Sequence, residues 1–114
     1  MVLSKGEKVL VLIRRLFEKD LRRRFIGEIT EATDYLIRVS GYAFIFDECI
    51  KDYMRRDSLQ INIFSLIDAG IVVILLPQDV NTAEIQYKET EKGHKIITDG
   101  KSFKMRVSEY GPNL

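Results

Sequence analysis

The sequence predicts a mainly β protein: a small five-stranded antiparallel bent barrel followed by a C-terminal β-hairpin extension. Three observations favour this fold class. Short runs of β-branched and aromatic residues recur along the chain, turn signals separate them, and a glycine interrupts each of the two longest runs. The length of 114 residues is that of one domain, and 46% hydrophobic with 31% charged residues is ordinary globular composition.

The first segment, residues 9–25, is compatible with two structures. As a helix, it places apolar residues from Leu10 to Leu21 on one stripe. As a strand, its beginning at residues 9–13 is rich in β-branched side chains. We favour a strand over about 9–17, because five strands can curl into a barrel whereas four would leave an open sheet. The helix remains the alternative.

The next two predicted strands are long, and each contains a glycine. Residues 22–33 alternate around Gly27, and a tight reversal follows at Asp34. Residues 36–46 begin with one apolar face and, beyond Gly41, become apolar on both faces. A glycine inside a strand indicates a bend or bulge. A strand with two apolar faces needs a layer on each side.

Two more strands complete the barrel. Residues 47–58 are highly charged and predict a loop or a single helical turn. Residues 60–66 alternate as a strand, and the fully apolar run 71–76 is ended by Pro77. The barrel therefore occupies residues 1–77.

The tail, residues 78–114, has the pattern of β-hairpins packed on the barrel within one compact domain. Residues 84–90 alternate, and a short strand is expected at 94–98. The pair Asp99-Gly100 is a strong two-residue hairpin signal. Alternate residues from 103 to 107 are then apolar and share a face.

This order of features resembles the Sm-like family, in which a bacterial RNA chaperone and the spliceosomal ring proteins share a five-stranded bent barrel. The resemblance covers about residues 9–77. It depends on Gly27, the acidic turn at Asp34, the strand 37–41 and a strand–glycine–strand unit over 61–77. Other SH3-like barrels share these motifs.

The RNA-contacting residues of that family are not matched here. In the family the acidic turn is followed shortly by an asparagine that holds a base, but residues 34–38 contain none. The family also has a basic or polar residue beside the glycine of its second motif. In this chain Asp68 lies near Gly70 instead, and its negative charge would repel a phosphate.

A basic segment precedes an acidic one. Residues 1–27 carry eight positive and three negative charges, and residues 28–50 carry one positive and five negative charges. The cations could bind nucleic-acid phosphates, or they could form a solvated face and pair with nearby acids. The second interpretation is favoured because the whole chain has a net charge of only +1. The candidate phosphate-binding residues are Arg14, Arg15, Arg22, Arg23, Arg24 and Arg38.

Two apolar strands offer a candidate contact surface. An edge strand with apolar faces on both sides invites strand addition by a neighbouring subunit. Alternatively, the hairpins of residues 83–108 cover the same faces within one chain, and the sequence does not decide between the two. The candidate interaction residues are Tyr42, Phe44, Phe46, Val72 and Ile74.

The residue types argue against an enzyme. The chain has one cysteine, Cys49, and one histidine, His94, so an internal disulfide or a structural zinc site is not expected. No catalytic constellation, phosphate loop or dinucleotide fingerprint is present. We therefore predict no catalytic residue, metal, cofactor or small-molecule substrate.

The function predicted from these observations is a non-enzymatic interaction module that self-associates as a homo-oligomer. The alternative is a module that binds RNA or single-stranded nucleic acid through the basic segment 14–24. The longest apolar runs have five or six residues, whereas a membrane span needs about 20. We therefore expect a cytoplasmic protein with no membrane partner.

Overall fold

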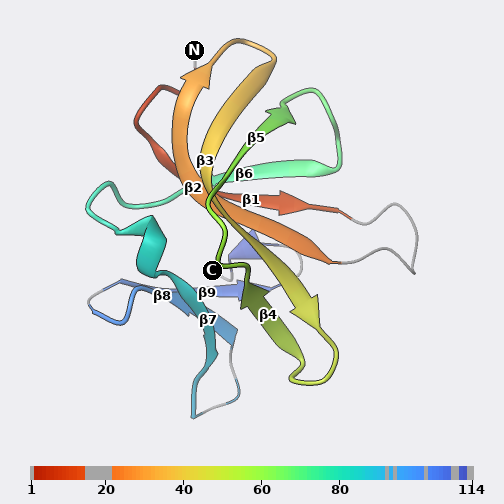
Figure 1. Cartoon of the computed structure of the whole chain (residues 1–114), viewed down its shortest axis with the longest axis vertical. Helices are drawn as coiled ribbons and strands as arrows, with labels where there is room; N and C mark the ends of the chain where they lie inside the picture. The colour runs from red at the N-terminus through yellow and green to blue at the C-terminus, as the bar shows by residue number, and fades with distance from the viewer. Residues whose placement is uncertain are drawn as a thin grey trace.

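The fold comes from a computed structural model, and it is mainly β, with two antiparallel sheets (Figure 1). This confirms the prediction that the protein is mainly β with antiparallel strands. Among the described residues there is no α-helix, and one turn of 3-10 helix, η1, spans Thr82–Glu84. The structure describes residues 2–14, 22–91, 93, 95–101, 103–108 and 111–112.

The first sheet contains all strands of the predicted barrel. Its strands are β1 (Lys8–Ile13), β2 (Arg23–Ala32), β3 (Leu36–Asp47), β4 (Asp52–Arg55), β5 (Gln60–Ser65) and β6 (Ile71–Leu75). The hydrogen-bonded order is β4-β3-β2-β1-β6, and β5 pairs with β3. The strand predicted at the start of the chain is confirmed over β1. Its expected continuation to residue 17 lies outside the described residues.

Strand β4 corrects the prediction that residues 47–58 form a loop or helical turn. The segment turns back after β3 and pairs with its second half, placing Tyr53 opposite Phe46 and Arg55 opposite Phe44. The many charged residues of this segment hide the alternation that a strand requires. The contact with β3 decides the conformation, because propensity is a weak prior when tertiary pairing is available.

Gly27 and Gly41 allow β2 and β3 to bend together. They are directly opposite in the antiparallel ladder. A Cβ on Gly27 would lie 2.3 Å from the Ser40 carbonyl oxygen, and one on Gly41 would lie 2.1 Å from that of Ile26. No side chain fits at either place, so the predicted bend is explained by close backbone approach. At this bend β3 changes partners, from β5 along its first half to β4 along its second.

The sheet is not closed into the predicted barrel. Within the described part of the chain, β5 pairs with β3 alone and β6 pairs with β1 alone, so the sheet is open between β5 and β6. Residues 66–70 join these two strands through a turn in which the Ile71 amide donates to the Asp68 carbonyl at 3.1 Å. A strand pattern predicts strands, but it does not determine which edges meet.

The concave side of the first sheet holds one hydrophobic core. Phe25 and Phe64 meet there with ring centroids 5.5 Å apart. The N-terminal segment adds Leu3, and the Gly6 amide donates to the Ile29 carbonyl at 2.8 Å. The buried members are Leu3, Val9, Val11, Phe25, Ile29, Ile37, Val39 and Phe64.

A second sheet covers the opposite side of β1 and β2. Its strands are β7 (Gln86–Glu89), β8 (Lys95–Thr98), β9 (Lys104–Ser108) and β10 (Gly111–Pro112), in the order β10-β9-β8-β7. Strand β1 is therefore covered on both faces, which explains its continuous apolar run. The core between the sheets comprises Leu10, Leu12, Ile26, Phe44, Leu76, Val80, Ile85, Tyr87 and Ile97.

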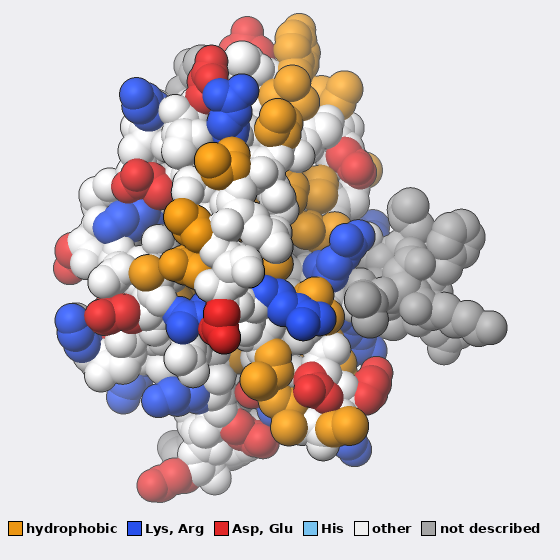
Figure 2. All heavy atoms as spheres, in the orientation of Figure 1, with side chains coloured by type: hydrophobic (Ala, Val, Ile, Leu, Met, Phe, Trp, Pro, Cys, Tyr) orange, Lys and Arg blue, Asp and Glu red, His pale blue; other side chains and the backbone are white. Residues whose placement is uncertain are grey.

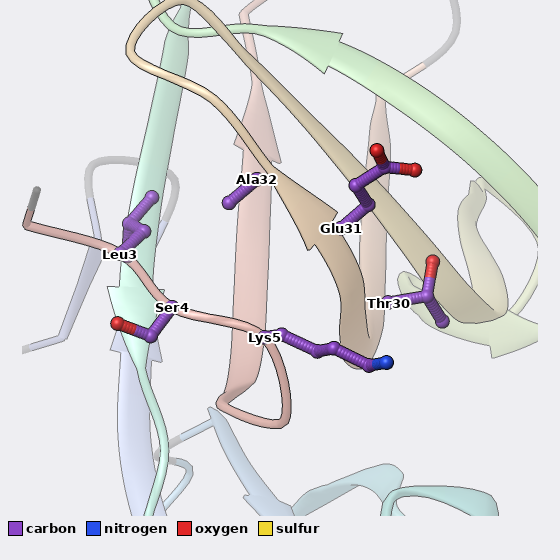
Figure 3. A pocket seen from close by; sticks show the side chains of 6 residues that line it. All are labelled: Leu3, Ser4, Lys5, Thr30, Glu31 and Ala32. Carbon is purple, nitrogen blue, oxygen red and sulfur yellow. The ribbon is translucent and has the colours of Figure 1, made fainter.

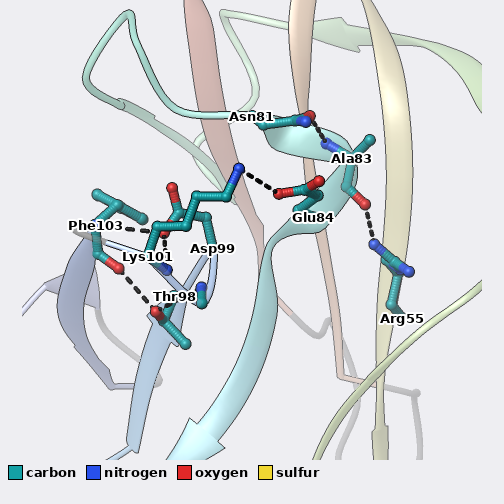
Figure 4. A network of polar contacts seen from close by, with 9 residues as sticks. Arg55, Asn81, Ala83, Glu84, Thr98, Asp99, Lys101 and Phe103 are labelled. Carbon is teal, nitrogen blue, oxygen red and sulfur yellow. Dashed lines mark hydrogen bonds and ion pairs between the residues drawn. The ribbon is translucent and has the colours of Figure 1, made fainter.

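Polar contacts fix the segment that links the two sheets (Figure 4). The guanidinium of Arg55 on β4 donates to the Ala83 carbonyl in η1. The Asn81 side chain caps η1 by accepting from the Ala83 amide at 3.0 Å, and Lys101 pairs with Glu84 at 3.4 Å. Because η1 is bonded both to β4 and to the hairpin that joins β8 to β9, it sets the position of the second sheet.

Candidate interaction surfaces

Arg24, the last residue of the predicted basic segment 14–24, lies between the two sheets. It is only 4% exposed. Its guanidinium Nη1 donates to the Tyr87 hydroxyl at 3.0 Å and lies 4.4 Å from the centroid of the Tyr53 ring. A guanidinium stacked on aromatic rings is a favourable cation–π arrangement. Arg24 therefore joins β2 to β4 and β7, and it is not accessible to a nucleic acid.

Tyr87 is held in its neutral form at this position. Burial raises the pKa of Tyr87 to about 12, although the charge of Arg24 and its hydrogen bond act in the opposite direction. The neutral hydroxyl accepts from Arg24, while the ring packs on Phe44 at a centroid distance of 5.4 Å. Tyr87 therefore has two roles: its hydroxyl accepts a hydrogen bond from the buried Arg24, and its ring packs in the core.

Arg22 shares the face of Arg24, because side chains two positions apart in a strand point the same way. Its guanidinium lies 5.0 Å from the Phe46 ring centroid, and that ring meets Tyr53 edge-on at 5.4 Å. We call this set the aromatic stack. It comprises Arg22, Phe46, Tyr53, Arg24 and Tyr87.

The other predicted cations do not gather into one site. Arg23 is exposed and, by strand alternation, lies on the face of β2 opposite to the aromatic stack. Arg14 is also exposed and directly follows the last residue of β1. Arg38 pairs with Glu31 at 2.7 Å. Arg15 lies outside the described residues.

The predicted apolar contact surface is largely covered by the second sheet. Phe44 is 0% exposed and packs against Tyr87. Tyr42 and Ile74 are partly buried against the same core. The sequence left two alternatives open for these residues: contact with a neighbouring subunit, or cover by hairpins of the same chain. In the structure, the second sheet of the same chain covers them. Val72, at 47% exposure, remains at the surface.

A different apolar surface is exposed on β5. Ile61 is 65% exposed and Ile63 is 60% exposed, while their neighbour Phe64 is buried in the concave core. Figure 2 shows apolar side chains gathered over the region of β5. We call this surface the β5 row; its members are Leu36, Leu59, Ile61, Ile63 and Ile67. The alternation along residues 60–66 predicts which side chains share a face of this strand. It does not predict that the face with the isoleucines is exposed.

The backbone of β5 also has an unpaired edge. The Leu66 amide donates to the Tyr35 carbonyl at 2.7 Å, so the even-numbered residues direct their backbone groups toward β3. Those of Ile61, Ile63 and Ser65 point away from β3, and no described strand pairs with them.

The same reasoning gives an unpaired edge on β6. The Leu76 amide donates to the Lys8 carbonyl at 2.8 Å, so even-numbered residues of this strand face β1. The backbone groups of Ile71, Val73 and Leu75 point away, and no other described strand pairs with them. The opening of the first sheet therefore has two edges that can accept a further strand.

A shallow pocket lies beside the N-terminal segment (Figure 3), where the carboxylate of Glu31 is already bonded to Arg38. In the part of the chain that the structure describes, no three His, Cys, Asp or Glu side chains cluster closely enough to hold a metal ion. The pocket is lined by Leu3, Ser4, Lys5, Thr30, Glu31 and Ala32.

None of the helical residues that the structure describes forms a segment long and apolar enough to cross a membrane. Comparisons of the chain with protein-family models, with curated proteins and with solved structures find no match.

Proposed function

We propose that this chain is a non-enzymatic interaction module that self-associates by strand addition at the opening of its first sheet. The observation that carries the proposal is the β5 row beside an unpaired strand edge. Soluble proteins usually protect such an edge with a charge, a proline or a bulge. The strand from Gln60 to Ser65 has neither a charged residue nor a proline.

The backbone directions favour contact between β5 of one copy and β6 of the next. Residues directly opposite in an antiparallel ladder lie on the same face of the joined sheet. The outward-bonding residues of β5, such as Ile63, carry side chains on the outer face. Those of β6, such as Val73, carry side chains on the concave core face. Pairing them would place the isoleucines of the β5 row against the core side of the neighbour.

A symmetric contact between two β5 strands is less favourable. It would place Ile61 and Ile63 of both copies side by side on the outer face, where they would remain exposed. The β5-to-β6 contact is head-to-tail, and such contacts generate rings or filaments. In this proposal the first sheet is the part of the chain that resembles an Sm-like barrel. A strand of a neighbouring copy fills the opening between β5 and β6.

The expected strength is moderate. Full burial of one isoleucine side chain contributes about 1.5–3 kcal/mol. Two such side chains give about 3–6 kcal/mol, against an association cost of about 4–15 kcal/mol. Backbone hydrogen bonds along the new ladder must supply the remainder, so we expect self-association that depends on protein concentration.

Light scattering after gel filtration across the micromolar range tests this proposal. The double substitution Ile61→Lys/Ile63→Lys should shift the protein toward the monomer, since it charges the edge. The control Ile50→Lys/Met54→Lys adds the same charge at residues that are similarly exposed but outside the β5 row. It should leave the oligomer unchanged. A wild-type protein that stays monomeric throughout would refute self-association.

Binding of RNA through residues 14–24 is the alternative, and it has less support. Arg24 is buried, Arg22 packs in the aromatic stack, and Arg15 is outside the described residues. Of the arginines of this segment that the structure describes, Arg14 and Arg23 are the exposed ones. Titration of labelled RNA at two salt concentrations, with Arg14→Ala/Arg23→Ala as the variant, separates this alternative from self-association.

A further inference from the structure

A pocket lies at the opening between β5 and β6. Its volume is about 390 Å³, and sites that receive a ligand usually have about 300–1,000 Å³. Val73 lines the pocket from β6, and Leu66 lines it from the position that directly follows β5. We call it the opening pocket; its lining residues are Val2, Leu3, Thr33, Asp34, Leu66 and Val73.

The opening pocket leads from the surface to the concave core. Leu3 is a buried member of that core, and Leu66 and Val73 pack against it. Thr33 and Asp34 are exposed at the turn between β2 and β3. Because the buried walls of the pocket are apolar, it suits an apolar side chain that enters from the opening.

Hydrogen bonds hold the walls of the opening pocket in place. The Leu66 amide donates to the Tyr35 carbonyl at 2.7 Å, and the Leu36 amide donates to the Thr33 hydroxyl at 3.0 Å. Val73 is fixed by the ladder between β6 and β1. The pocket therefore needs little ordering when an occupant enters, which favours binding.

One register of β5 on a neighbouring β6 joins all the outward-bonding residues of both strands. The strands have six and five residues, so they overlap almost completely in this register. A shift by two residues leaves outward-bonding residues without a partner, and a shift by one turns the bonding groups away from each other. The pairs are Ile61 with Leu75, Ile63 with Val73, and Ser65 with Ile71.

We propose that the opening pocket of one copy receives the Ile63 side chain of the next copy. The inference rests on the proposed function, and it adds the side chain that enters and the register of the ladder. Residues directly opposite in an antiparallel ladder carry their side chains on the same face. The exposed side chain of Ile63, opposite Val73, therefore lies on the core side, beside the wall of the pocket. Ile61 then packs against Leu75, which is also exposed.

A second copy is the partner that both edges fit. A strand that joins β6 has to be extended and has to present apolar side chains at alternate positions to the pocket. Strand β5 meets this description, since Ile61 and Ile63 alternate along its open edge. Neither β5 nor β6 contains a charged residue or a proline, so neither like charges nor missing backbone donors oppose the contact.

Disulfide cross-linking between two variants of the full chain tests this pairing. One chain carries Ile63→Cys and the other carries Val73→Cys, both with Cys49→Ser, so that each chain has a single thiol. Opposite residues of an antiparallel ladder have Cα atoms about 4.5–5.5 Å apart, a separation that a disulfide can bridge. With oxidised glutathione as the oxidant, mass spectrometry should find the mixed dimer as the main cross-linked species.

The control combines Ile63→Cys with Leu75→Cys in the same background. These residues belong to the same two edges, but the register places them two positions out of line. Their Cα atoms are then farther apart than the roughly 7 Å that a disulfide can span. This pair should cross-link far less, and circular dichroism of each variant checks that it folds.

Removal of the entering side chain should weaken the contact. Ile63→Ala should raise the dissociation constant of self-association about tenfold or more, because the burial of its side chain is lost. Ile50→Ala is the control, since it makes the same truncation at an exposed residue of the β3–β4 turn. It should change the dissociation constant about twofold or less. Sedimentation equilibrium over a range of concentrations measures both constants.

The outcomes separate this inference from the proposed function. If the wild type self-associates but the control pair cross-links as well as Ile63→Cys with Val73→Cys, the opening pocket is not the site of Ile63 and self-association stands. Cross-linking of the Ile63→Cys chain mainly to itself would show a symmetric contact and would also overturn the inference. A wild-type protein that is monomeric at every concentration would overturn both.

Discussion

The second half of β3 and strand β5 both carry large apolar side chains, yet one is covered and the other is exposed. Phe44 on β3 packs beneath the second sheet and has no exposed surface. Ile63 on β5 is largely exposed, although its apolar character is similar. The difference arises because the second sheet lies over the β1–β2–β3 side and does not reach the β5 row. Apolar character alone does not identify a contact surface; the surface also has to be left uncovered by the rest of the chain.

The largest expected effect is the loss of stability when the covered side chain of Phe44 is removed. Phe44→Ala should lower the free energy of unfolding by about 3–5 kcal/mol, because it removes a buried ring and leaves a cavity. Ile63→Ala should change monomer stability by about 0.5 kcal/mol or less, since its site is mostly solvated. Urea denaturation of both variants measures the contrast, and equal losses would show that the two positions are not different in burial.

A smaller effect is expected at the bend that sets the partners of β3. Gly41→Ala should cost about 2–4 kcal/mol, because the new Cβ collides with backbone and β2 must move away from β3. Gly70→Ala is the control, since its Cβ would meet side-chain atoms and no backbone atom: a carboxylate oxygen of Asp68 at 3.2 Å and Arg14 Cβ at 3.6 Å. Thermal unfolding of the two variants tests this. If Gly41→Ala is as stable as the control, close approach is not the reason for the glycine pair.

The smallest effect concerns the hydroxyl that holds Arg24. The folded-state pKa of Tyr87, about 12, lies above its ordinary value of 10.0. Above pH 10 the unfolded chain loses the proton first, so stability falls with increasing pH until about pH 12. Two pKa units correspond to about 2–3 kcal/mol. Tyr87→Phe should remove this part of the alkaline loss.

Denaturation at several alkaline pH values measures the effect, with Tyr35→Phe as the control. Tyr35 is an exposed tyrosine at the β2–β3 turn, and removing its hydroxyl should leave the pH profile unchanged. A wild-type profile that is flat between pH 10 and 12 would contradict the burial of a neutral Tyr87 hydroxyl.

Much of the strand content could be predicted because it depends on local patterns. The apolar run in β1, the glycine inside each of the runs of β2 and β3, and the proline after β6 can all be read from a few neighbouring residues. Strand β4 could not be predicted, since its charged residues pair with β3 only after the chain folds back. The candidate sites were harder to predict from the sequence than the strands. Arg24 looked like a surface cation because a sequence does not show the aromatic residues that meet it from β4 and β7.

The sequence by itself determined the class of this protein, because the period of the side chains and the turn residues act over a few positions. It determined that residues 1–27 are basic and that the chain has one cysteine and one histidine. Only the tertiary structure decided which apolar face is covered, which arginine is buried and which edges remain open. The physical reason is that burial is a property of contacts between segments far apart in the chain, such as the contacts of the second sheet with β1, β2 and β3.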